Sequence, residues 1–326
     1  MKSFNIVQTE HYPDFDLKIT LKPCFRCNHR CWFCQEYDNS SQTRTKDDCD
    51  IVLAKLKTLP ANKQKLFFYF YGGEPTLSKH WEYLNYKLLD IFSNRELYLQ
   101  TQTNLSINKD RLKKFLKRAN SPYINICSSY HLDKQDVDEF IEKMDICDSY
   151  GALGLCFFST EIPKEDKFKY EFNKIAEKYP DKIKLKFTEI TDIKNRPEYK
   201  HLLEDKELVG TDNGKSIEYR YFMRKYPEYR NYFEEGWNFN IDGITKNYST
   251  VKAENIHKQF KFMKCECGTK HCVIDHELNV FPCNDYNYKN IKSQPVDAVD
   301  FSTYFLRDER CVLNACYDGL DHRKYK

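Results

Sequence analysis

Long apolar runs are missing from this chain of 326 residues: none approaches the ~20 residues that a helix needs to span a bilayer. The first residues also lack the apolar core of a signal peptide. Neither sign of charge is in excess, because 52 Lys and Arg stand against 49 Asp and Glu, for a net charge of +3. Such a balance creates no field that favours nucleic acid or a membrane surface. We therefore expect a cytoplasmic protein with no membrane partner, and nucleic acid is disfavoured as a partner.

Cysteine is abundant, with 14 residues, and in a chain without a secretion signal this favours metal ligation over a disulfide framework. Cys27, Cys31 and Cys34 stand in the segment CNHRCWFC with the spacing C-x3-C-x2-C. Three thiolates can hold a 4Fe–4S cluster through three irons and leave the fourth iron open to a small ligand. The loop follows a strand-like run at 17–22, and chemistry in strand–helix barrels occurs at that end of the strands.

A zinc site is the alternative for this loop. Cys24 and Cys27 form one C-x2-C pair, Cys31 and Cys34 form another, and zinc commonly takes two such pairs. Only three residues separate the pairs, which leaves little room for two zinc knuckles around one ion. On the cluster interpretation, Cys24 is a spare thiol packed at the strand end.

A second motif follows the apolar strand at 66–71, which ends in Gly72-Gly73-Glu74-Pro75. Taken alone, these residues are also typical of an ordinary turn. Glycines permit close approach of the backbone to a ligand, and Glu74 offers a carboxylate to an ammonium group.

The two motifs, in this order and at this separation, resemble the signatures of the radical S-adenosylmethionine (SAM) enzymes. The resemblance implies that the open iron chelates the methionine part of SAM and that Phe33 lies near the adenine. It also implies that residues 72–75 hold the SAM amino group. A low-potential donor such as flavodoxin or ferredoxin would supply an electron. Cleavage of SAM would then give a 5′-deoxyadenosyl radical that abstracts hydrogen from substrate.

Strand-like and helix-like segments alternate over the first ~190 residues, a pattern that predicts an α/β fold with a parallel sheet. Six strands and five helices are expected. The strands are 17–22, 65–71, 96–103, 123–129, 153–159 and 183–190, and the helices are 46–59, 79–93, 109–119, 133–150 and 164–179. Six units are too few for an eight-unit barrel and match the partial (β/α)6 barrel that the resemblance implies.

Three domains or regions are predicted. Residues 1–190 form the barrel, residues 191–249 form a bridge with a hairpin at 237–248, and residues 250–326 form a cysteine-rich extension. The aromatic residues of 217–239 are candidates to line a substrate cleft.

Polar residues at three strand ends are further candidates for the site. Asn104 ends the third strand, and the resemblance implies a contact with SAM, although capping of the strand–helix turn is the alternative. For Ser128, at the end of the fourth strand, the resemblance implies a contact with the ribose or carboxylate of SAM. His131 either assists there or lies at the surface, and Glu189 is a candidate substrate contact from position alone.

Six of the 14 cysteines lie after Lys264. Apolar pairs at 273–274 and 280–281 predict a β-hairpin bracketed by Cys272 and Cys283. This segment resembles the SPASM/twitch extension of peptide-modifying radical SAM enzymes. It departs from that pattern in having Leu278-Asn279 where a turn glycine is usual, and in keeping only Cys311 and Cys316 beyond the hairpin.

The cysteine count predicts one auxiliary 4Fe–4S cluster rather than two. The expected ligands are Cys267, Cys272, Cys283 and Cys316, with Cys265 and Cys311 as rivals. A zinc ribbon is the alternative, because four-cysteine zinc sites use similar hairpins.

The catalytic base and the substrate are the least constrained features. Asp285 and Tyr286 follow Cys283, and in the anaerobic sulfatase-maturating relatives an aspartate near this cysteine serves as a base, here offset by one position. Ordinary turn chemistry is the alternative.

The extension favours a peptide or protein residue as substrate over a small molecule such as a nucleotide, sugar or amino acid. A zinc-bearing nucleic-acid binder would explain the cysteines, but neither the Gly-Gly-Glu-Pro segment nor the near-neutral charge.

Overall fold

The structure, a computed structural model, describes most of the first 187 residues and parts of the remainder. The described residues are 3–6, 15–31, 34, 43–132, 134–160, 165–187, 204, 217–232, 237–241, 244–248, 264–265, 270–283, 293–305 and 324–325. Across these ranges, no helix combines the length and the apolar character needed to cross a membrane.

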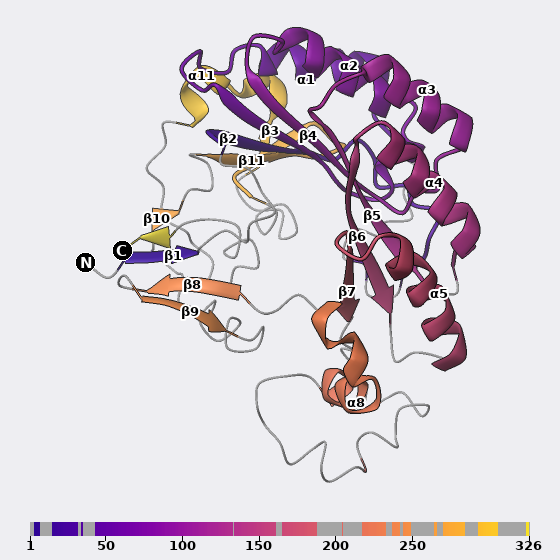
Figure 1. The fold of residues 1–326 in the computed structure, drawn as a ribbon. Helices are drawn as coiled ribbons and strands as arrows, with labels where there is room; N and C mark the ends of the chain where they lie inside the picture. The colour runs from indigo at the N-terminus through magenta and orange to yellow at the C-terminus, as the bar shows by residue number, and fades with distance from the viewer. Residues whose placement is uncertain are drawn as a thin grey trace.

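Six parallel strands lie side by side in chain order in a nine-stranded sheet, in which the last of them forms one edge (Figure 1). They are β2 (Leu17–Leu21), β3 (Lys65–Phe70), β4 (Glu96–Thr103), β5 (Ile124–His131), β6 (Leu153–Thr160) and β7 (Ile183–Phe187). Each strand pairs with the next one along the chain. The predicted α/β class and the six-unit partial barrel are confirmed.

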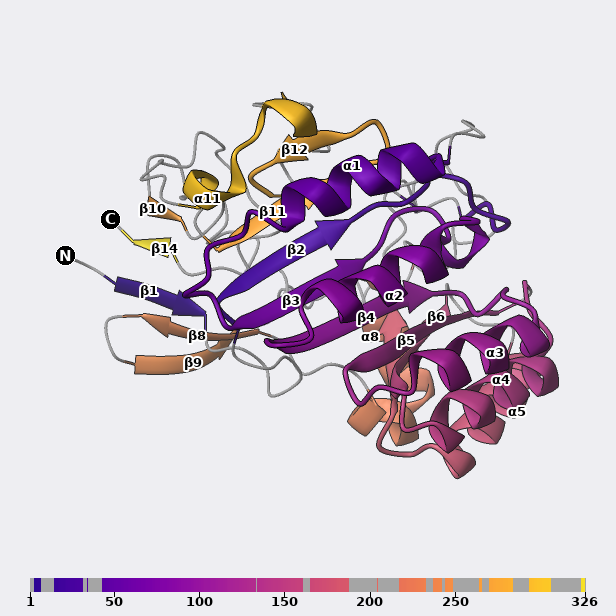
Figure 2. The same cartoon turned by 90° about the horizontal axis from the view of Figure 1, so that it is seen from above.

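Five helices connect these strands and cover one face of the sheet (Figures 1 and 2). They are α1 (Lys46–Leu56), α2 (Trp81–Ile91), α3 (Lys109–Ala119), α4 (Val137–Ser149) and α5 (Glu165–Lys178). Side-chain caps fix where several of them begin: Thr45 and Asp48 form a capping box on α1, and Asn108 caps α3. The helix-facing side chains of β2, from Leu17 to Leu21, have no exposed surface, and the main core therefore lies between sheet and helices.

The cysteine-rich extension joins the same sheet. β11 (His271–Ile274) pairs parallel with β2 and places Cys272 opposite Ile19. β12 (Asn279–Phe281) forms the predicted hairpin with β11, and β13 (Gln294–Pro295) forms the edge. Two short helices follow, η5 (Val296–Ala298) and α11 (Phe301–Tyr304). Residues far apart in sequence thus share one hydrogen-bonded layer.

A second, antiparallel sheet brings both ends of the chain together, and the two termini lie side by side in Figure 1. Its order is β10-β14-β1-β8-β9. The strands are β1 (Ser3–Ile6), β8 (Trp237–Ile241), β9 (Ile244–Tyr248), β10 (Lys264–Cys265) and β14 (Lys324–Tyr325). The hairpin predicted at 237–248 is confirmed as β8 and β9, whereas β1 and β14 were not anticipated.

The described part of the bridge around residues 220–232 contributes to the core. Within the bridge lie α8 (Ile217–Lys225) and the 3-10 helix η4 (Pro227–Tyr232). Phe222, Tyr226 and Tyr229 are at most 4% exposed, and all three pack on Phe168 of α5. These three rings stabilise the end of the barrel and do not line a cleft, while a substrate cleft at the other aromatic residues of 217–239 stays a prediction.

Candidate functional site

Loops from four neighbouring strands meet at the carboxyl end of the parallel sheet. The segment of Cys27 follows β2, and Gly72-Gly73-Glu74 follows β3. Thr103 and Asn104 end β4, and His131 ends β5. Because parallel strands all point one way, residues separated by up to a hundred positions meet at one edge of the sheet.

The three loop cysteines differ from the buried cysteines of the chain. Cys27 and Cys31 are half-buried and Cys34 is exposed, and the Cys34 amide donates to the Cys31 carbonyl at 3.0 Å. The Cys27 sulfur accepts from the His29 amide at 3.4 Å and faces the Asn104 amide nitrogen at 3.9 Å. Accessible sulfurs with nearby N–H donors are the donor set that an iron–sulfur cluster requires, so these residues fit such a group.

Burial raises the pKa of the Cys27 thiol to about 11, and its effect on the more deeply buried Cys24 is larger. It raises the pKa of Cys24 to about 12, with the Glu74 carboxylate adding to the effect. The Cys24 thiol donates to the Glu74 carbonyl at 3.3 Å, and its backbone forms a β-bridge with Thr43. A thiol held protonated in this way packs at the strand end, as the cluster interpretation expects. Cys127, Cys147 and Cys156 are buried too and pack as small, largely apolar side chains.

The two glycines of the second motif allow it to dock directly beneath the cysteine loop. The Gly73 amide donates to the Cys24 carbonyl at 3.1 Å, and the Glu74 amide donates to the Arg26 carbonyl at 2.8 Å. A Cβ atom on Gly73 would lie 2.3 Å from the Phe25 carbonyl oxygen and 2.5 Å from that of Arg26. Close approach to the neighbouring loop therefore explains the need for glycine here, alongside any approach to a ligand.

Glu74 is 1% exposed, and its carboxylate is held by protein groups. Oε1 accepts from the Thr76 amide at 3.1 Å, the Thr76 hydroxyl at 2.5 Å and the Thr103 hydroxyl at 2.6 Å, and Oε2 accepts from the Asn104 amide at 2.7 Å. It also caps the short helix η1 (Pro75–Leu77). Burial raises the pKa of Glu74, and these four hydrogen bonds oppose the rise. The carboxylate thus ties the loop after β3 to the end of β4.

Asn104 closes the strand–helix turn, the alternative that its sequence position offered, and its contact with SAM stays a prediction. Its side-chain oxygen accepts from the Ser106 amide at 2.9 Å, a turn-capping contact. Its amide nitrogen donates to Asn28 in the cysteine loop at 3.0 Å. Asn104 therefore positions the cysteine loop while closing its own turn.

The end of β5 presents a different serine from the predicted one. Ser128 is fully buried and, by strand alternation, lies on the same face as Tyr130, whose ring packs on Phe140 of α4. Ser129 lies on the opposite face with His131, and its hydroxyl accepts from the Gln102 amide at 2.8 Å. Counting back from His131 in steps of two would have indicated Ser129 from the sequence.

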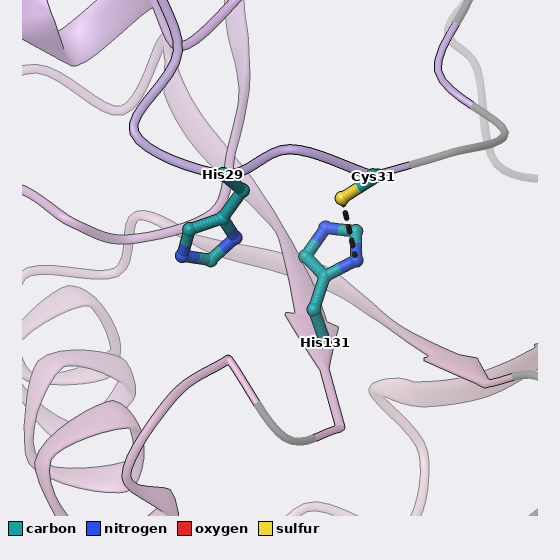
Figure 3. A group of neighbouring side chains, drawn as sticks. All are labelled: His29, Cys31 and His131. Atoms are coloured by element: carbon teal, nitrogen blue, oxygen red, sulfur yellow. Dashed lines mark hydrogen bonds between the residues drawn. The ribbon is translucent and has the colours of Figure 1, made fainter.

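A histidine missed by sequence reasoning lies beside the cluster motif (Figure 3). The His29 ring makes an edge contact with the His131 ring, with centroids 5.4 Å apart, and His131 Nδ1 lies 3.7 Å from the Cys31 sulfur. Burial, with the nearby Lys134 charge, lowers the pKa of His29. Both rings therefore contact or approach the predicted metal-binding loop.

In the extension, Cys272 is fully buried on β11 and Cys283 is 1% exposed just after β12. Burial raises the pKa of the Cys272 thiol. Leu278 adopts a left-handed conformation, φ 66°, at the turn where the resemblance places a glycine. The remaining candidates, Phe33, Glu189, Cys267, Asp285, Tyr286, Cys311 and Cys316, lie outside the described residues, as does the side chain of Cys265.

Comparison with known proteins gives one family and a set of similar folds. Residues 21–167 match the family described as Radical SAM superfamily. Curated protein sequences give no match. Streptococcus suis SuiB bound to S-adenosylmethionine is similar with a TM-score of 0.51 at 15% identity, over 94% of this chain and 68% of that chain.

Two peptide-bound structures are similar to a comparable degree. SuiB with the precursor peptide SuiA has a TM-score of 0.50 at 14% identity, over 90% of this chain and 65% of that chain. The structure of anSMEcpe with AdoMet and Cp18Cys peptide has a TM-score of 0.50 at 15% identity, over 90% of this chain and 80% of that chain. The chain thus spans about two thirds of SuiB, and identities this low show a shared fold alone.

Proposed function

Because residues 21–167 form a radical SAM domain, we propose that the protein cleaves SAM reductively and abstracts hydrogen from a peptide or protein residue. The observation that carries this proposal is the docking of Gly73 and Glu74 on the backbone of the loop that presents Cys27, Cys31 and Cys34. The two predicted signatures meet at one edge of the sheet. When bound, the 4Fe–4S cluster and SAM supply the electron transfer and the 5′-deoxyadenosyl radical.

The chain's own residues would hold and orient these groups. Cys27, Cys31 and Cys34 would bind the cluster, and the His29 amide would donate to the Cys27 sulfur. Glu74 would act mainly by fixing the loop after β3 and the end of β4, because four donors already hold its carboxylate. The backbone of Gly72 and Gly73 then remains as the group to meet the SAM amino end.

Further residues are proposed to contact SAM or to position the loops around it. Phe33 would lie against the adenine, Pro75 would set the turn that carries Glu74, and Asn104 would hold the cysteine loop through Asn28. At the end of β5 we propose Ser129 in preference to Ser128. Ser129 shares the face of the strand that carries His131 next to the cysteine loop.

We also propose one auxiliary 4Fe–4S cluster in residues 250–326, bound by Cys267, Cys272, Cys283 and Cys316. Support comes from the hairpin that places Cys272 and Cys283 near its base, with Val273 paired to Phe281. Metal analysis after substitution of Cys272 and Cys283 by serine separates this cluster from a zinc ribbon. Loss of about four irons per chain is expected, and loss of one zinc would contradict the proposal.

A peptide substrate is favoured because SuiB and anSMEcpe, which are similar in fold, have been seen with peptides. Asp285 or Tyr286 would serve as the base in that reaction, and Glu189 would contact the substrate. A low-potential flavodoxin or ferredoxin in the cytoplasm is the proposed electron donor. Screening short peptides against nucleotides, sugars and amino acids for substrate-dependent 5′-deoxyadenosine would separate peptide from small-molecule chemistry.

The deciding experiment is anaerobic reconstitution followed by an assay of reductant-dependent conversion of SAM to 5′-deoxyadenosine. A Cys27→Ala/Cys31→Ala/Cys34→Ala triple variant is expected to lose all product. Cys24→Ser is the matched control from the same loop, and we expect it to retain product because Cys24 packs as a thiol. Zinc in place of iron and no product in the wild type would exclude the proposed function.

A further inference from the structure

Three side chains from two of the loops that meet at the site converge on one point at its edge. His29 and Cys31 stand on the loop after β2, and His131 reaches them from the end of β5 (Figure 3). One ligand atom from each, a ring nitrogen or the sulfur, lies within 4.8 Å of the other two. They come from positions a hundred residues apart, so only the fold brings them together.

His29, Cys31 and His131 offer the ligand atoms that a zinc-type cation prefers. Thiolate sulfur and imidazole nitrogen are the two preferred ligands of zinc, at about 2.3 and 2.0–2.1 Å. In a tetrahedral site such ligands are roughly 3.4 Å apart, so the three atoms, now within 4.8 Å of one another, need to approach by at most about 1.4 Å. Side-chain rotation on the 27–31 loop can supply that movement.

An independent observation also points to a ligand at this place. His29 is 8% exposed, and its buried Nδ1 atom has no hydrogen-bond partner among the residues that the structure describes. A buried polar atom left without a partner costs about 1–3 kcal/mol, so such atoms usually have a function or a missing ligand. In Figure 3 one ring nitrogen of His29 faces His131.

We propose that the cluster-free protein binds a divalent zinc-type cation through Cys31 Sγ and one ring nitrogen each of His29 and His131. Three protein ligands leave the fourth tetrahedral position to water. The cation and the proposed 4Fe–4S cluster exclude one another because both need the Cys31 sulfur. This exclusion, unlike the cation site itself, rests on the proposed function.

The test is a titration of the reduced, cluster-free full chain with Co²⁺, which reports thiolate ligation through its charge-transfer absorption. Subtracting the spectrum of the Cys31→Ser variant removes the absorption that comes from cobalt bound at other cysteines. We expect one cobalt per chain in that difference, displaced by Zn²⁺. Affinity should fall at least tenfold in His29→Ala and in His131→Ala. Cys34→Ser, on the same loop but outside the set, should bind as the wild type does.

Two outcomes would overturn the site. One is the absence of any Cys31-dependent cobalt absorption. The other is that both histidine variants still bind cobalt as the wild type does while Cys34→Ser does not, because this pattern indicates a site of three thiolates. If His29→Ala fails to fold, X-ray absorption of the wild-type cobalt protein decides: one sulfur with nitrogen supports the site, and three sulfurs refute it.

The exclusion is tested separately after reconstitution with iron and sulfide. Cys31-dependent cobalt binding should then disappear, and its persistence beside an intact cluster would refute the exclusion. If no cluster forms at all, the proposed function fails, whereas the cobalt titration still decides the cation site.

Discussion

Glu74 shows how a side chain in a recognisable motif can act through protein contacts. Its position suggests a carboxylate offered to an ammonium group, and the structure surrounds it with donors from Thr76, Thr103 and Asn104. The four hydrogen bonds to this buried carboxylate hold the loop after β3 and the end of β4 together. Its effect on a ligand at the site would be indirect, through the positions of Gly73 and Asn104.

Replacing Glu74 by Gln keeps the shape of the side chain but places its NH2 group against the hydrogen-bond donors of Thr76 and Thr103 or of Asn104. We expect Glu74→Gln to lower the free energy of unfolding by about 1–3 kcal/mol, because buried donors lose an acceptor. Urea denaturation measures this change. The control is Glu96→Gln, since Glu96 lies in an exposed pair with Lys65 and its replacement should cost within about 0.5 kcal/mol. Equal costs for the two variants would contradict the assignment.

Gly73 gives a steric prediction. Alanine there would place its Cβ against two backbone carbonyl oxygens, those of Phe25 and Arg26, which cannot move without shifting the cysteine loop. We expect Gly73→Ala to destabilise the protein by about 1–3 kcal/mol and to impair cluster reconstitution.

Gly151→Ala is the matched control for Gly73→Ala, because nothing lies within 4 Å of its added Cβ. Only its left-handed backbone, φ 66°, penalises alanine, at about 1 kcal/mol. Thermal unfolding and iron content measure both variants. Normal iron content in Gly73→Ala would show that the loop tolerates the shift.

The thiols differ in ways that alkylation can measure. Burial raises the pKa of Cys147 and of Cys156 to about 12, so at pH 8.5 fewer than about one in a thousand is a thiolate. We expect iodoacetamide to label exposed Cys34 of the cluster-free protein first, and Cys147 and Cys156 only on unfolding. Peptide mapping by mass spectrometry gives the order. Early labelling of Cys156 in the folded protein would be inconsistent with this packing.

At the scale of elements, Arg44 links the loop before α1 to the turn of the C-terminal hairpin. Its guanidinium is 1% exposed and donates to the carbonyls of Ile274, at 2.8 Å, and Asp275. The Phe25 ring also meets the His276 ring edge-on, with centroids 4.0 Å apart. The hairpin of the proposed auxiliary cluster is therefore coupled directly to the cysteine loop.

This coupling predicts a local effect of Arg44→Met. Two buried carbonyls would lose their donor, at about 1–3 kcal/mol, so the turn at 275–278 should open more often. Hydrogen exchange should become faster for the Asp275 and Leu278 amides, which are bonded within that turn and hairpin, and stay unchanged in α3. Arg44→Lys, which keeps a donor, is the control and should show a smaller change. Uniform acceleration across the protein would indicate a global effect instead.

At the scale of the whole molecule, the extension and the barrel form one sheet. β11 covers the edge of β2, and the Thr20 hydroxyl lies 3.0 Å from His271 Nε2, with both side chains fully buried. Residues 250–326 are a region by composition, but part of them completes the barrel. The boundary near residue 250 is therefore not a division of the sheet, since β11 pairs with β2 across it. We propose that it marks a change of function.

A chain ending at residue 249 is therefore expected to be insoluble or to lack a cooperative melt, because β2 would become an unpaired apolar edge. The control is a full-length Cys272→Ser/Cys283→Ser variant, which keeps the strands and removes two proposed ligands. It should retain cooperative unfolding, measured by circular dichroism. A soluble, cooperatively melting truncation would show that the barrel closes without β11.

Local sequence determined much of this protein. The alternation of strand-like and helix-like segments predicted the six parallel strands and their helices, because periodicity and capping are encoded within a few residues. The cysteine spacing and the Gly-Gly-Glu-Pro segment similarly indicated the family. The β11–β12 hairpin was predictable for the same reason.

Tertiary structure decided what depends on residues far apart in the chain. It turned Glu74 inward to Thr103, chose Ser129 over Ser128 for the face next to the cysteine loop, and buried the bridge rings on Phe168. It also paired β11 with β2, joined both chain ends in the second sheet, and gathered His29, Cys31 and His131. Apart from the choice of Ser129, which strand alternation could have indicated, no local pattern encodes these contacts, because each follows from packing of the whole sheet.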